Sequence, residues 1–256
     1  MTLQINEKLL SPGERLLWEY GIVTPDEIDL EAIAADRGLS VRRRRLDGAD
    51  ARLVATATAG IITVNSSTSE ERQRFSIGHE LGHWERDRKH GLINLCSKSD
   101  LAQSNQIAKN SEAEANVFSA DLILPPYLVS TRIADKEASV NLILDVAGEF
   151  RASREATGIR VARLSRTPAL VMVFSQHGRK WSIKNSAWPH YINPTGVVHH
   201  DSPSMELLFT GANGAKTRDQ KEPALRWLVG ENLRTVDVKV QSVKLSNNEI
   251  MTIVRL

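Results

Sequence analysis

The chain has 256 residues, of which 41% are hydrophobic and 25% are charged, a composition that excludes a disordered or fibrous protein. Its 33 basic and 31 acidic residues leave a net charge of +2, so bulk attraction to nucleic acid or to an anionic membrane is not expected. No apolar run approaches the roughly 18 residues of a membrane helix, and the N-terminus lacks signal-peptide features. Cys96 is the one cysteine, which excludes an intrachain disulfide and favours a cytoplasmic protein.

The first part of the chain predicts helices and a few short strands. Helix starts at Ser11 and Thr24 are each followed by a proline, and Gly38 is expected to end the second helix. Three strands are expected around residues 40–43, 53–54 and 61–64. Four further helices are expected at about residues 69–89, 111–123, 140–150 and 153–164, with the second of these ending at a pair of prolines.

From residue 167 onward the pattern changes to short β-rich runs. These are expected at residues 170–174, 181–184, 197–200, 207–209, 236–245 and 251–256. A change of phase between Val240 and Val243 suggests a β-bulge, and Asn247-Asn248 a hairpin turn. The sequence therefore predicts an α+β protein with a domain at residues 1–165, which includes a helical segment at about 138–165, and a smaller β-rich domain at residues 166–256.

The motif His79-Glu80-Leu81-Gly82-His83 carries the clearest chemical information. Histidines four residues apart project from one face of a helix, where both imidazoles can bind one Zn²⁺. The carboxylate of Glu80 can then reach a metal-bound water and act as general base. Gly78 and Gly82 are unusual inside a helix, and they indicate either the close approach of a backbone or substrate, or tight packing.

A catalytic zinc needs a third protein ligand. The next predicted helix offers Glu112, with Asn116 one turn later as a hydrogen-bond partner for a ligand histidine. Glu114 is the less favoured alternative, because it lies about 160° from Glu112 around the helix and both cannot face one metal. Two solvated glutamates near a helix N-terminus are the structural alternative.

These two segments together resemble the ImmA/IrrE family of zinc metallopeptidases. The resemblance rests on residues 72–83, which contain the histidine motif, and on Glu112–Pro125, and it extends over roughly residues 10–165. It implies a minimal gluzincin-like α/β core with a sheet behind the active-site helix. His79, His83 and Glu112 would bind one Zn²⁺ per chain, and Glu80 would be the base.

The family resemblance also implies an activity. It is limited cleavage of a helix-turn-helix repressor or antitoxin, which releases the target genes. An edge strand of the sheet would pair with the extended substrate, which we expect near residues 61–65. A partner-regulated toxin–antitoxin system is a related possibility.

Several residues depart from the family pattern or allow two interpretations. Trp84 stands near the place of a usual leucine-histidine pair, and His90 is expected at the surface. Tyr127 is a speculative oxyanion donor, although a packed tyrosine is the preferred interpretation. Cys96 is expected to be a small buried side chain rather than a metal ligand.

No sequence motif in the C-terminal region indicates a ligand. The histidines at positions 177, 199 and 200, with Asp201, lack metal-like spacing, and the tryptophans at 181, 188 and 227 are expected to pack a small core. The main alternative function is a DNA- or protein-binding regulator with a structural or vestigial metal site. Its basis is the pair of helices at residues 140–150 and 153–164, with an arginine cluster at residues 151–166. We interpret them more readily as packing helices that support the catalytic core or grip the partner, and the cluster as a solvated helix face.

Overall fold

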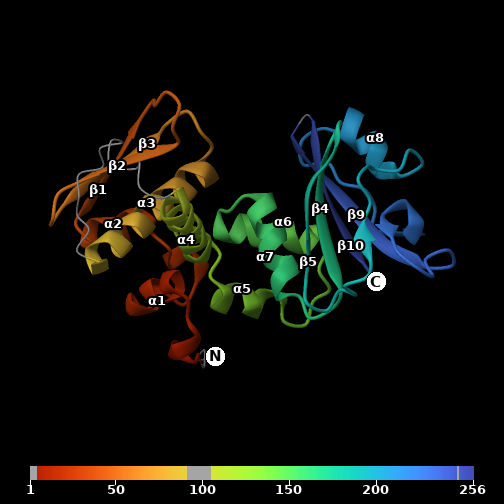
Figure 1. Cartoon of the computed structure of the whole chain (residues 1–256), viewed down its shortest axis with the longest axis horizontal. Helices are drawn as coiled ribbons and strands as arrows, with labels where there is room; N and C mark the ends of the chain where they lie inside the picture. Colours follow the sequence, from red (N-terminus) through yellow and green to blue (C-terminus); the bar gives the residue numbers. More distant parts are fainter. Residues whose placement is uncertain (1–4, 91–104, 247) are drawn as a thin grey trace. The chain divides into compact units, whose positions relative to one another are not determined.

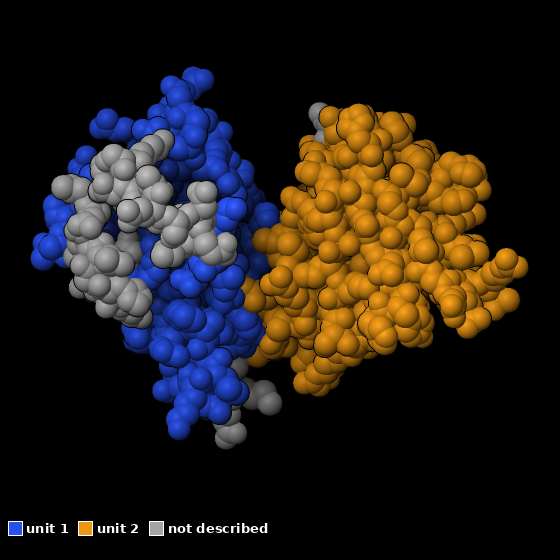
Figure 2. All heavy atoms as spheres, in the orientation of Figure 1, with its two compact units in different colours: residues 1–128, 149–153 blue, residues 129–148, 154–256 orange. Residues whose placement is uncertain are grey.

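The computed structural model describes residues 5–90, 105–246 and 248–256, without the side chains of residues 87–90 and 105–108. These residues divide into two compact units (Figure 2). One unit consists of residues 1–128 with 149–153, and the other of residues 129–148 with 154–256. Both units combine helices with a sheet, and the C-terminal part is rich in strands, so the predicted α+β class is confirmed. Among the described helices, none has the length and apolar character needed to cross a bilayer.

The described part of the first unit contains three strands and the helices that accompany them (Figure 1). In chain order they are η1 (Glu7–Leu9), α1 (Pro12–Glu19), η2 (Pro25–Glu27), α2 (Leu30–Asp36), β1 (Leu39–Arg44), β2 (Ala51–Ala55), β3 (Gly60–Asn65), α3 (Glu70–His90), α4 (Asn105–Ile123) and the first part of α5 (Pro126–Ile133).

Local signals explain where the first helices begin. Ser11 and Glu14 form a capping box at the start of α1, as the sequence indicates. The helix expected from Thr24 is divided instead: η2 ends at Glu27, and α2 starts after Asp29, whose carboxylate accepts hydrogen bonds from two backbone N–H groups of the first turn. Gly38 has φ of 87° and follows the end of α2, which confirms the predicted stop.

The sheet of the first unit has the order β1-β3-β2, with β1 parallel and β2 antiparallel to β3. Leu39, Ile62 and Val64 share one face of the sheet and are buried. Strand β3 lies in the centre of this sheet, so the expectation of a substrate-binding edge near residues 61–65 is wrong. The edges among the described strands are β1 and β2, because these two strands pair with opposite sides of β3.

The second unit is built on a five-stranded antiparallel sheet with the order β5-β4-β10-β9-β7. Its elements are the remainder of α5, α6 (Val140–Phe150), α7 (Arg154–Leu164), β4 (Ala169–Ser175), β5 (Gly178–Lys184), β6 (Asn193–Pro194), α8 (Pro203–Thr210), β7 (Gln220–Pro223), η3 (Ala224–Arg226), β8 (Leu228–Val229), β9 (Asp237–Ser246) and β10 (Glu249–Arg255). Trp188 and Trp227 are buried in the core of this unit, as predicted, whereas Trp181 is only partly buried.

Three predictions for this unit are wrong. Residues 197–200, expected as a strand, lie in a bend and a turn between β6 and α8. Residues 207–209 lie in helix α8, because Ser202 caps the helix and Pro203 occupies its first turn, while a short apolar run alone does not distinguish helix from strand. The register is continuous from Val240 to Val243, and the irregularity lies at Leu245 instead. The phase change arises because β9 is buried on both faces there, with Ser242 hydrogen bonded to Ser204 and Thr252.

The predicted domain boundary at residues 165–168 falls inside the second compact unit. Helix α7 belongs to that unit, where Gly158 packs closely against Met251 of β10. The boundary between the two compact units therefore lies earlier in the chain than the boundary predicted from the composition. The division into functional domains at residue 165 stays a prediction.

Helices α3 and α4 cross at very short range. A Cβ atom on Gly78 would lie 2.6 Å from the hydroxyl oxygen of Ser119, and one on Gly82 would lie 3.0 Å from the ring of Phe118. The Ser119 hydroxyl is buried and donates a 2.7 Å hydrogen bond to the carbonyl of Phe75 on α3. The glycines therefore permit the backbone of α4 to approach α3, since the added Cβ atoms would also lie 3.3 Å from Cα of Ser119 and of Ala115, and this approach is itself tight packing.

Replacing Gly78 with alanine should destabilise the protein by about 1–3 kcal/mol, because the new methyl group displaces the Ser119 hydroxyl from its buried hydrogen bond. Gly148→Ala in α6 is the matched control, since nothing lies within 4 Å of its added Cβ. It should be neutral or stabilising by up to about 1 kcal/mol. Urea unfolding of the two variants would measure the difference, and equal stabilities would contradict this account.

Candidate metal centre

Helix α3 presents the two motif histidines from one face, one turn apart. The rings of His79 and His83 are partly buried, with centroids 4.7 Å apart and planes at 79° to each other. Their Nε2 atoms are 3.1 Å apart. The helix thus directs one nitrogen of each ring toward a common point.

Helix α4 completes the cluster with Glu112. One carboxylate oxygen lies 3.3 Å from Nε2 of His79, and the other lies 3.3 Å from Nε2 of His83. Oxygen and nitrogen atoms that bind one zinc tetrahedrally at about 2.0–2.1 Å are separated by roughly 3.3 Å from one another. Each separation matches this value, and one ligand atom from each of the three residues lies within 4.8 Å of the other two, so the cluster could hold one metal ion.

The opposite nitrogens of the two rings have their own partners. Asn116 places its amide oxygen 3.1 Å from Nδ1 of His79, which is the contact predicted from its position one turn after Glu112. The Ser111 hydroxyl lies 3.4 Å from Nδ1 of His83, a contact that the sequence analysis missed although Ser111 directly precedes Glu112. An amide oxygen only accepts hydrogen bonds, so it holds the ring hydrogen of His79 on Nδ1 and leaves Nε2 with a lone pair.

The donor chemistry of the cluster fits a divalent cation. Nε2 of His79 faces the carboxylate of Glu112 and Nε2 of His83, and the carboxylate is acceptor-only when ionised. Lone pairs and negative charge that converge in this way repel one another unless a cation lies between them. Two imidazoles and one carboxylate are also a ligand set used by catalytic zinc.

Glu80 is held next to this cluster without belonging to it. Burial, together with the nearby negative charge of Glu112, raises the pKa of Glu80 to about 7. The ordinary value for glutamate is about 4.3. The carboxyl group is thus suited to exchanging a proton near neutral pH, as a general base requires.

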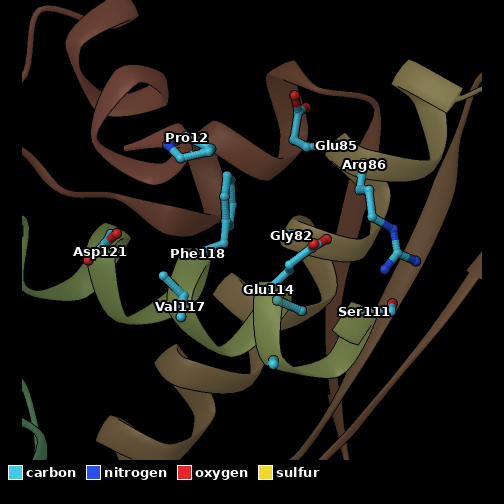
Figure 3. A pocket seen from close by; sticks show the side chains of 11 residues that line it. Pro12, Gly82, Glu85, Arg86, Ser111, Glu114, Val117, Phe118 and Asp121 are labelled. Carbon is cyan, nitrogen blue, oxygen red and sulfur yellow. The ribbon is translucent and has the colours of Figure 1, made fainter. Parts of the chain in front are cut away.

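Glu114 lies on another side of α4 from the histidine cluster. It lines a cavity of about 510 Å³ between α1, α3 and α4, together with Pro12, Gly82 and Phe118. Figure 3 shows Phe118 beside Pro12, and Glu114 next to Gly82. The structure therefore brings Glu112, and not Glu114, to the two histidines.

Tyr127 is a buried residue at the start of α5. Its hydroxyl donates a 2.7 Å hydrogen bond to the carbonyl of Ile22, and its backbone N–H donates to the carboxylate of Glu14. The ring packs edge-on against Trp18. These contacts give Tyr127 a packing role and do not bring its hydroxyl to the histidine cluster.

Other candidate ligands fall elsewhere. His199, His200 and Asp201 come within metal-binding distance of one another, which their spacing did not suggest, but the cluster is largely exposed and Asp201 also lies 4.0 Å from the guanidinium of Arg226. The Cys96 prediction and the side chain of His90 lie outside the described residues.

A histidine-pair helix packed on a small sheet, with a carboxylate from the following helix, defines a protein of the metallopeptidase-like class. The family model for the IrrE N-terminal-like domain, peptidase M78, matches residues 34–162. This is half of the chain, and the chain belongs to that family. The predicted ImmA/IrrE resemblance is thereby confirmed.

Comparison with solved structures shows a similar fold in a Mycobacterium tuberculosis transcriptional regulator. The TM-score is 0.58 at 15% sequence identity, covering 95% of this chain and 74% of that chain. At this identity the likeness concerns the fold alone. A search among curated proteins found no match.

The pKa of Glu80 has a consequence for the metal-free protein. Between about pH 4.5 and pH 7 the unfolded chain has lost the Glu80 proton that the folded chain still holds, so this group opposes folding increasingly as the pH rises and fully above about pH 7. Glu80→Gln should therefore stabilise the metal-free protein at pH 8 by about 1–3 kcal/mol, and by much less at pH 5.

Urea unfolding after dialysis against a chelator would measure this difference at the two pH values. Glu114→Gln is the matched control, since that carboxylate is exposed and lies on another side of α4, and it should show no such pH-dependent gain. A stabilisation of Glu80→Gln that is equal at pH 5 and pH 8 would contradict the assignment.

Proposed function

We propose that this protein is a zinc-dependent endopeptidase that makes a limited cleavage in a helix-turn-helix repressor or antitoxin. The observation that carries the proposal is the convergence of four atoms, Nε2 of His79, Nε2 of His83 and both carboxylate oxygens of Glu112, with three contacts of 3.1–3.3 Å beside a buried carboxyl group. Membership of the peptidase M78 family supports the same reaction class.

Each residue has a defined role in this proposal. His79, His83 and Glu112 would hold the zinc, and Asn116 and Ser111 would fix the ring orientations through the Nδ1 atoms. When bound, zinc supplies a Lewis acid that polarises the scissile carbonyl and lowers the pKa of water.

Glu80 would carry the proton through the reaction. It accepts the proton of the attacking water as the water adds to the carbonyl carbon, and it then delivers that proton to the leaving amine. A cation beside Glu80 opposes the effects of burial and of Glu112, and thus draws its pKa downward from about 7. The base is then ionised at neutral pH before each cycle.

Strand β2 is the edge most suited to an extended substrate. It pairs only with β3 among the described strands, and it packs against α3, the helix that carries the histidines. The preceding Asp50 forms an ion pair with Arg72 of α3, which ties this edge to the catalytic helix. A peptide that adds to β2 would be held by main-chain hydrogen bonds alongside the metal centre.

The proposed substrate is a protein that acts in transcription. A transcriptional context is supported by the family and by the fold likeness to a transcriptional regulator. A soluble repressor or antitoxin would meet the enzyme in the cytoplasm. We infer that its scissile segment must become extended in order to pair with β2.

A non-catalytic DNA-binding regulator is the alternative. Three residues join α6 to α7, and Arg151 in this turn has φ of 49°. However, Thr157 and Gly158 of α7 are buried, and Arg154 donates a hydrogen bond to the carbonyl of Lys244 in the same unit. The arginines around α7 are thus divided between packing and solvent, which weakens the helix-turn-helix interpretation.

Metal content tests the ligand set. Wild-type protein purified without added metal should hold about one zinc per chain by elemental analysis, and Glu112→Ala should lose most of it. Glu114→Ala is the matched control and should retain zinc, because this carboxylate lines the neighbouring cavity. Retention by Glu112→Ala together with loss by Glu114→Ala would reverse the assignment.

Catalysis is tested through Glu80. Glu80→Gln should keep its zinc and lower proteolysis by about 10²–10⁴-fold, since the amide cannot accept the proton. The assay incubates the zinc-loaded protein with soluble extract of the cells that encode it and detects new N-termini by mass spectrometry. Glu114→Gln should cleave as the wild type does. Equal cleavage by Glu80→Gln would exclude its role as base.

A further inference from the structure

The face of the first sheet that points away from the buried core carries a row of arginines. The strand registers align Arg42 of β1 and Arg52 of β2 on either side of Thr63 of β3, so these three side chains share one face. Arg44 stands two residues beyond Arg42 and therefore on that same face. We call Arg42, Arg44 and Arg52 the arginine row; all three are exposed.

The arginine row has no acidic partner among the described residues. None of its members takes part in an ion pair there, and Arg52 donates only to the backbone carbonyl of Asp47, at 3.4 Å. The neighbouring Arg43 points to the opposite face and behaves differently, since it pairs with Glu31 and contacts Gln73. The positive charge of the outer face is thus uncompensated, whereas that of the inner face is paired.

Arg52 lies where this basic face meets the free edge of β2. Its backbone belongs to the strand edge, and its side chain stands on the outer face. A strand added to β2 would place one residue directly opposite Arg52 on the same face, with Cβ atoms about 4.5–5.5 Å apart. Opposite charges at such positions stabilise the pairing, and like charges destabilise it.

Val54, two residues after Arg52 on the same strand, is apolar and exposed. Val54 is 68% exposed, and it shares its row on the outer face with Ile61. An added strand would cover Val54 with a side chain two residues from the one opposite Arg52. A β-branched or other apolar residue would bury the most surface there.

We propose that the arginine row and Val54 select the substrate segment that pairs with β2, by requiring an acidic residue opposite Arg52 and an apolar residue two positions away. This inference rests on the proposed function for the identity of the bound segment. A protein segment fits this face better than single-stranded nucleic acid, because the three strands place no aromatic side chain there for base stacking.

Two end-blocked heptapeptides with a neutral fluorophore provide the probe. One has a central glutamate, valines two residues to either side and threonines elsewhere, and the other has lysine at the centre. Binding is measured by fluorescence anisotropy at low ionic strength on zinc-loaded Glu80→Gln protein, so that neither peptide is cut. The glutamate peptide should bind about five- to tenfold more tightly than the lysine peptide, and high salt should reduce this preference.

Charge reversal then tests the residues. In the added double variant Arg42→Glu/Arg52→Glu, the lysine peptide should become the tighter ligand. Arg166→Glu, an equal charge change at an exposed position of the second unit, should leave the preference unaltered. Arg52→Gln is a milder variant, which should abolish the preference without reversing it, and circular dichroism should show that each variant is folded.

Several outcomes would overturn the proposal. These are equal binding of the two peptides, no binding of either, an equal change in Arg166→Glu, or tighter arginine-dependent binding of a 20-base-pair duplex DNA. Failure of the proposed function is a separate result. If the glutamate peptide binds through the arginine row but zinc-loaded wild-type protein cleaves nothing, the docking surface stands and the endopeptidase assignment does not.

Discussion

The close crossing of α3 and α4 is the constraint on which the metal centre depends. The ligands come from two helices, and a carboxylate reaches both imidazoles only if the helix backbones approach nearly to contact. Gly78 and Gly82 permit this approach, and the Ser119 hydroxyl fixes it with a buried hydrogen bond to α3. A side chain at either glycine would separate the helices and move Glu112 away from the histidines. The helix-weakening glycines are therefore part of the site, although neither contacts a ligand atom.

The packing of α3 against α4 also determines which charged groups lie close together. The crossing concentrates a carboxylate and two imidazole lone pairs in a small space and holds the carboxyl group of Glu80 nearby, with its pKa raised to about 7. Without a cation these groups oppose one another, and the metal-free fold is the less stable for it. A bound cation converts the same repulsion into affinity and restores the charge of Glu80. In the proposed function, metal binding and activation of the base would thus be two results of one arrangement.

The sequence predicted those features of the fold and site that depend on residues close together in the chain. The spacing of His79 and His83 and the position of Asn116 one turn after Glu112 are set by helix geometry, so their placement was predictable. The contact of Ser111 with His83 depends on the angle between two helices, which no local pattern contains. The central position of β3 depends on strand order, a non-local property, and it was predicted wrongly. Residues 207–209 show the related limit that a short apolar run is compatible with helix and strand.

The two faces of the first sheet differ in composition and burial. The inner face is apolar at Leu39, Ile62 and Val64 and supports the helices, so its composition is fixed by packing. On the outer face the side chains of Arg42, Arg44, Arg52 and Val54 are exposed, and in the proposed function they are available for recognition. The difference between the faces is hard to recognise in the sequence, where four arginines, Arg42 to Arg45, follow one another. In the strand, alternate side chains belong to different faces. Strand β2 pairs only with β3 among the described strands and packs against α3, while its residues Arg52 and Val54 lie on the outer face. A segment that pairs there would be aligned for cleavage and tested for charge in the same binding event.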